Sequence, residues 1–123
     1  MILAKYRKYS TSIIRIGLGL VFLANSYTAF VSPDEFNRLI SESFLVGLLP
    51  VNLDLLVKFI GVSDGIVAAL LLIGKGQKYV AVYASLWLMG VMAVIGAKEP
   101  ADLLEHFGPL SMAIYLMLNE SPK

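Results

Sequence analysis

The sequence predicts an all-α membrane protein, namely a transmembrane four-helix bundle with a short amphipathic interfacial helix between spans 1 and 2. Three observations predict this fold. Apolar residues make up 58% of the 123 residues, and the mean hydropathy is +0.76. Charged residues make up only 15%, against about 25% in an average soluble domain. Four segments approach the roughly 20 apolar residues that a helix needs to cross a hydrocarbon core of about 30 Å.

The predicted spans form a single integral membrane domain over residues 1–123. They cover residues 12–31, 51–73, 79–97 and 102–118, of which the last is the shortest. Arg15 interrupts the first apolar segment early. This position favours an uncleaved first span over a secretory signal peptide.

The connection between the first two spans, residues 33–46, is predicted to be an interfacial helix. Its start, Ser32-Pro33-Asp34-Glu35, has the pattern of a capping box with proline in the first turn. Apolar and polar side chains then fall on opposite faces, which is typical of a helix that lies in the interface. The apolar face holds Phe36, Leu39, Ile40 and Phe44, and the polar face holds Asn37, Arg38, Ser41 and Glu42. We favour a connector that covers the outer mouth of the bundle over a substrate-gating lid.

The charges of the connecting segments predict the orientation in the membrane. Lys5, Arg7 and Lys8 precede the first span, and Lys75 and Lys78 flank the turn after the second. The other two connections carry mainly acidic residues. The positive-inside rule therefore places the N-terminus and the C-terminus in the cytoplasm.

Composition also excludes several classes of function. The net charge of +1 indicates no nucleic-acid partner. The absence of cysteine excludes structural disulfides, thiolate metal sites and dithiol redox chemistry. A single histidine cannot form a metal site without other ligands, so no metal is expected, and no catalytic residue is identified.

Asp64 is unusual, because it is an acidic residue inside the apolar second span. It precedes Gly74 by ten residues, about 15 Å of helix, which places it near the midplane of the membrane. A carboxylate there costs roughly 2.5–3.5 kcal/mol on insertion scales. We expect it to face the bundle interior, where it finds a polar partner or is protonated. The small residues Gly61, Gly65 and Ala68 on or beside its face favour close approach of another helix.

Polar residues of the first span are the predicted partners of Asp64. The alternatives are Arg15, directly or through water, and the Asn25–Ser26 pair, which lies closer to its depth. Two interpretations of Asp64 remain open. It forms a polar pair that fixes helix register, or it transfers protons or binds a ligand.

Two further positions are candidates for a site. His106, at the outer start of the fourth span, serves either as an interfacial structural residue or as a proton relay or ligand-binding residue. Tyr83 and Trp87, one helical turn apart in the third span, are packing residues or the walls of an aromatic pocket.

The chain resembles the DoxX family of small four-span membrane proteins, which includes DoxD-like proteins. The resemblance rests on "RIGLGLVFLANSYTAF" in the first span, then "GLLP", then "FIGVSDGIVAALLLIGKGQKYVAVYASLWLMGVMA". The matching positions are Arg15, Phe22, Gly47, Pro50, Gly61, Asp64 and Gly74. The chain departs from the family where the first span usually ends with a basic residue and where Asp64 replaces the more common glutamate. Some relatives are quinone-reducing subunits in thiosulfate oxidation, and others accompany redox or detoxification systems.

The resemblance implies a membrane subunit of a redox system, with a quinone between the spans near Asp64, Arg15 and His106. No cofactor is evident from the residues themselves. The alternative is a non-catalytic scaffold or accessory subunit of a larger membrane complex. A transporter or proton path is less well supported, because there is one deep acid and no second inner carboxylate. The expected partners are the lipid bilayer and further protein subunits or copies of this chain, in the plasma membrane of a prokaryote.

Overall fold

The computed structural model describes residues 2–43 and 52–119. These residues form four long helices and one short helix: α1 (Ser10–Val31), α4 (Leu53–Ile73), α5 (Gln77–Ile95), α6 (Pro100–Leu118) and the short α2 (Asp34–Ser41). Two 3₁₀ segments, η1 (Ile2–Tyr9) and η2 (Gly96–Lys98), precede α1 and α6. No strand occurs in this part of the chain, so the all-α prediction is confirmed.

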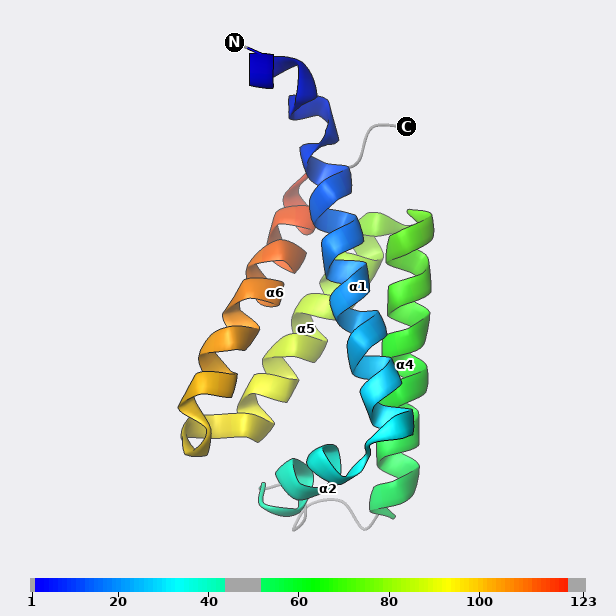
Figure 1. Cartoon of the computed structure of the whole chain (residues 1–123), viewed down its shortest axis with the longest axis vertical. Coiled ribbons are helices and arrows are strands. Elements are labelled where there is room, and N and C mark those ends of the chain that lie inside the picture. The colour runs from blue at the N-terminus through cyan, green and yellow to red at the C-terminus, as the bar shows by residue number, and fades with distance from the viewer. Residues whose placement is uncertain (1, 44–51, 120–123) are drawn as a thin grey trace.

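The long helices form two pairs, α1 with α4 and α5 with α6 (Figure 1). The pairs meet at the end of the molecule where the chain termini lie, and they diverge toward the opposite end. The helix α2 lies at this open end, between the two pairs. The chain therefore has one closed end and one splayed end.

An apolar core fills the closed end. Its largest side chains are Leu18 and Phe22 from α1, Leu71 from α4, Leu88 from α5 and Leu116 from α6, all at most 2% exposed. Gln77 adds polar links between α5 and α6, because its Nε2 donates to the carbonyls of Leu116 (3.1 Å) and Asn119 (2.5 Å). Contacts from all four long helices thus seal this end.

The α1–α4 contact is close because α4 carries small residues along it. A Cβ atom built on Gly65 would lie 3.1 Å from Ser26 Oγ, and one on Gly61 would lie 2.8 Å from the Phe30 ring. On the other helix, a Cβ atom on Gly19 would meet Leu72 at 3.1 Å. The predicted close packing through the glycine row of the second span is confirmed.

Three helices are long and apolar enough to cross a membrane, counted over the described residues and by length and composition alone. They are Leu3–Val31, Leu53–Ile73 and Gln77–Lys98. The predicted fourth span, now α6, is not among them. Its first half contains Asp102, Glu105 and His106, which lower its hydropathy.

The start of α2 differs from the prediction. The N-cap position is Pro33, with no side-chain cap, and the predicted capping box of Ser32 and Glu35 does not form. The reason is that Ser32 ends α1, where its backbone N–H donates to the carbonyl of Thr28. The helix ends at Ser41, and the predicted residues 44–46, with Gly47 and Pro50, lie outside the described residues.

The helix α2 is tied across the open end by its charged face. Arg38 Nη1 donates to Glu99 Oε1 at 2.9 Å, and Lys98 Nζ donates to the carbonyl of Glu42 at 2.8 Å. The hydrogen bond to Glu99 raises the pKa of Arg38 above its usual value. Ile40, on the other face, packs with Ala29 and Val57. Thus α2 lies where a cover of the mouth is expected.

A candidate ligand cavity beneath α2

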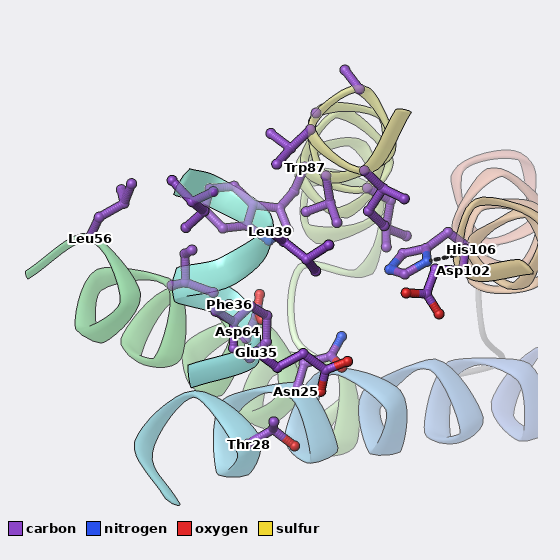
Figure 2. Close-up of a pocket in the computed structure, with 18 of the residues that line it drawn as sticks. Asn25, Thr28, Glu35, Phe36, Leu39, Leu56, Asp64, Trp87, Asp102 and His106 are labelled. Atoms are coloured by element: carbon purple, nitrogen blue, oxygen red, sulfur yellow. Dashed lines mark hydrogen bonds between the residues drawn. The ribbon is translucent and has the colours of Figure 1, made fainter. Parts of the chain in front are cut away.

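A cavity of about 560 Å³ lies between the two helix pairs, beneath α2 (Figure 2). Its wall is mostly apolar, with aromatic side chains from α1, α2, α4 and α5: Phe22, Phe36, Phe59 and Trp87. Its polar lining residues are Asn25, Thr28, Glu35, Asp64, Asp102 and His106. A mostly apolar concave site with a few convergent polar groups is the usual form of a small-molecule site.

Asp64 lies in the wall of this cavity near the middle of α4. It is 3% exposed, so the expected interior position is confirmed. The indole N–H of Trp87, on α5, interacts with its carboxyl group. One carboxyl oxygen, Oδ1, is buried and has no hydrogen-bond partner among the described residues. A buried acceptor without a partner is uncommon in folded proteins and calls for an explanation.

Neither residue of the Asn25–Ser26 pair donates to Asp64 in the structure. The Ser26 hydroxyl donates instead to the carbonyl of Gly61 at 2.7 Å and ties α1 to α4. Asn25 lines the same cavity as Asp64. Of the pair, only Asn25 therefore shares the cavity with the acid.

Arg15 is not the partner of Asp64, which corrects one of the two predicted alternatives. Its Nη1 donates to the carbonyls of Leu71 and Leu72, the latter at 3.2 Å, in the last turn of α4. Those carbonyls are seven and eight residues beyond Asp64, roughly 10–12 Å along the helix axis. The last carbonyls of a helix have no partner within it, so the guanidinium is attracted there rather than to the acid.

His106 reaches the cavity from α6. Its Nδ1 lies 2.7 Å from the carbonyl oxygen of Asp102, one turn earlier. A carbonyl can only accept, so Nδ1 carries the proton, and in the neutral ring Nε2 is an acceptor. Figure 2 shows the imidazole directed from α6 toward the space between the helices. In its neutral form, His106 therefore presents a hydrogen-bond acceptor to the cavity.

The structure thus brings together three of the five predicted site residues, Asp64, Asn25 and His106. Arg15 and Ser26 instead connect α1 to α4. Sequence reasoning missed Glu35 and Asp102 as lining residues. The i, i+4 spacing of Asp102 and His106 could have indicated Asp102, whereas nothing in the sequence indicated that α2 would carry Glu35 to the mouth.

A protein-family model described as Methylamine utilisation protein MauE matches residues 7–99. The chain belongs to the MauE family. In this MauE-family protein the matched segment contains Asn25, Asp64 and Trp87, and it ends before Asp102 and His106. No curated protein and no solved structure matches the chain. Family membership and the three apolar helices make it an integral membrane protein.

Proposed function

We propose that this MauE-family protein is the ligand-binding membrane subunit of a redox system and that its cavity binds a quinone. The description of the family ties its members to methylamine utilisation, and we extend an accessory role in such a system to this chain. The resemblance to the DoxX family supports the choice of a quinone. The chain has no cysteine and cannot cycle a dithiol, so the electrons would pass to or from a partner protein.

One observation carries this proposal: the apolar cavity contains a buried carboxyl oxygen without a partner. An apolar ring fits the phenylalanine and tryptophan side chains of the wall, because aromatic rings stack on one another. A donor group of the ligand at Asp64 would provide the missing hydrogen bond, and a quinone carries such a group, a hydroxyl, once it is reduced. A purely structural role for Asp64 does not explain why Oδ1 lacks a partner.

The topology is part of the proposal. We place α6 across the membrane as the fourth span, because it is as long as α5 and packs along it. The closed end, which carries Lys5, Arg7, Lys8 and Lys75, then faces the cytoplasm with both termini. The open end, with α2, Glu99 and the mouth of the cavity, faces outward.

Trp87 provides the test, because it is the sole tryptophan of the sequence and it lines the cavity. Purified protein in detergent is titrated with tetramethyl-para-benzoquinone while the fluorescence of Trp87 is recorded. We expect saturable quenching, whereas collisional quenching would grow linearly with concentration.

Two glycines provide matched variants for this titration. A Cβ atom at Gly90 or at Gly108 meets nothing within 4 Å, but only Gly90 lines the cavity. Gly90→Leu should abolish the saturable phase, and Gly108→Leu should retain it. Linear quenching in the wild type, or equal saturation in both variants, would contradict quinone binding in this cavity.

The non-catalytic scaffold is the second candidate, and one observation favours it. A second, apolar groove of about 410 Å³ lies between α4 and α5, lined by Val62, Ile66, Leu70, Tyr79 and Tyr83 among others. A helix of a larger complex would fill such a groove. This alternative would be supported if a partner protein co-purifies with the wild type and with a Gly90 variant but not with an Ile66 variant.

A further inference from the structure

The polar groups that line the cavity are predominantly hydrogen-bond acceptors. Glu35, Asp64 and Asp102 contribute carboxyl groups, and His106 contributes Nε2. None of the described lining residues is a lysine or an arginine. The ligand therefore meets acceptors at the buried end of the cavity and at its mouth.

The donors that line the cavity are, with one exception, already engaged by the protein. The Thr28 hydroxyl donates to the carbonyl of Ala24 at 3.0 Å. The Nδ1–H group of His106 donates to the carbonyl of Asp102, and the indole N–H of Trp87 interacts with the carboxyl group of Asp64. The side-chain amide of Asn25 is the exception, since it can donate to a ligand. Acceptors exceed free donors in either protonation state of Asp64, because a protonated carboxyl adds only one O–H group.

We infer that the cavity selects ligands whose polar groups donate hydrogen bonds, so that of the two forms of a quinone it holds the hydroquinone. This inference rests on the proposed function and adds the redox form of the ligand. Each hydroxyl of a hydroquinone donates one hydrogen bond, whereas the oxygens of the quinone only accept. The hydroquinone can satisfy Oδ1 of Asp64, whereas the quinone would place a second acceptor against it.

Organic ammonium ions also donate hydrogen bonds, but the cavity suits them less well. The carboxylates of Glu35 and Asp102 at the mouth would attract a cation. However, the wall around the unpartnered oxygen of Asp64 is largely apolar. Moving a cation into such surroundings costs far more solvation than moving a neutral hydroxyl group. The structure therefore favours a neutral donor at the buried end.

The test compares three probes that share one ring. Binding to the full chain in detergent is measured by Trp87 quenching with tetramethyl-para-benzoquinone, with its hydroquinone and with the dimethyl ether of that hydroquinone. The hydroquinone is kept reduced anaerobically with dithiothreitol, which finds no cysteine to modify. We expect the hydroquinone to bind about tenfold more tightly than the quinone, which corresponds to roughly one hydrogen bond. The ether, which cannot donate, should bind no more tightly than the quinone.

Asp64→Asn provides a second test, because it should change the preference for the hydroquinone over the quinone. The amide keeps the shape of the side chain but adds two donors, so the preference for the hydroquinone should shrink or reverse toward the quinone. Quinone binding equal to or tighter than hydroquinone binding in the wild type would overturn the inference and leave the proposed function standing. Displacement of the bound quinone by butylammonium, but not by the hydroquinone, would also overturn the inference. Failure of all three ring probes to bind would refute the proposed function itself.

Discussion

At the scale of single residues, the position of Asp64 is maintained without a strong ionic partner. At its predicted depth near the midplane of the membrane, a carboxylate costs roughly 2.5–3.5 kcal/mol, and among the described residues Trp87 is the side-chain donor that interacts with it. Arg15 does not reach it, because the guanidinium binds the end of α4. We therefore expect the acid to contribute little to stability, in agreement with the proposed role in ligand binding.

This view predicts the stability of Asp64→Leu. We expect the melting temperature in detergent to stay the same or rise, because a buried group with an unsatisfied oxygen is replaced by an apolar one and only the half-buried Trp87 loses an acceptor. Binding of the hydroquinone should weaken by about tenfold, because its hydrogen bond to the carboxyl group is lost. Ser26→Ala is the comparison, since it removes the buried bond to Gly61 and should cost about 0.6 kcal/mol. A larger loss in Asp64→Leu than in Ser26→Ala would show that the acid has a structural partner.

At the scale of elements, two polar side chains of α1 bind α4 at different points along its length. Ser26 binds the backbone in the middle of the helix, and Arg15 binds the carbonyls at its C-terminus. The helix ends at Gly74 in the left-handed conformation, φ +89°. A Cβ atom on this glycine would lie 3.1 Å from the Arg15 guanidinium. The turn and its arginine therefore act together as one end cap.

Loss of this cap should lower stability without affecting the cavity. We expect Arg15→Met to destabilise the protein by about 1.5–3 kcal/mol, toward the lower end because the side chain is only half-buried. The quenching of Trp87 by ligand should stay unchanged, since Arg15 does not line the cavity. Arg7→Met, which removes an equal charge from an exposed position in η1, is the control in the same thermal melts. An altered ligand affinity in Arg15→Met would link the arginine to the site.

The two glycines of α4 at its contact with α1, Gly61 and Gly65, predict a second effect on stability. Gly65→Leu should cost about 1–3 kcal/mol through overpacking, because Ser26, which it would displace, is held by its bond to Gly61. Gly61→Leu is a weaker test, since the Phe30 ring that it meets is 55% exposed and can move aside. Melting in detergent, with Gly108→Leu as the control, measures the effect. Equal melting temperatures of Gly65→Leu and the control Gly108→Leu would refute the close α1–α4 contact.

At the scale of the whole molecule, the proposed orientation predicts which cysteine variants react from outside. The chain has no cysteine of its own, so each introduced thiol is unique. Ser41→Cys and Ala97→Cys lie at the open end, and Tyr6→Cys lies near the N-terminus; all three positions are exposed. An impermeant maleimide should label the first two in intact cells and the third only after lysis. Gln77 is unsuitable as an inner site, because it is buried and holds α6. Rapid labelling of Tyr6→Cys in intact cells would reverse the orientation.

The helices and the interior position of Asp64 were predictable because they follow from local energetics. Long apolar segments require helices, and an acid among small residues requires an interior. The partners of Arg15 were not predictable, since they depend on where the end of α4 falls beside α1. The contact between Asp64 and Trp87 depends on how far the helix pairs diverge. No local pattern encodes that angle, and the cavity results from it.

The sealed end of the bundle has a consequence for the membrane voltage. Three residues of the apolar core, Leu18, Leu71 and Leu116, lie between the level of Asp64 and the end that holds the termini. If this end faces the cytoplasm, a charge that moved between the mouth and Asp64 would cross only the outer part of the electric field. Complete crossing is worth about 2.3 kcal/mol per 100 mV for each elementary charge. In that orientation, the closed end would keep protons from crossing the membrane, and proton exchange between Asp64 and the mouth of the cavity would leave the membrane voltage intact.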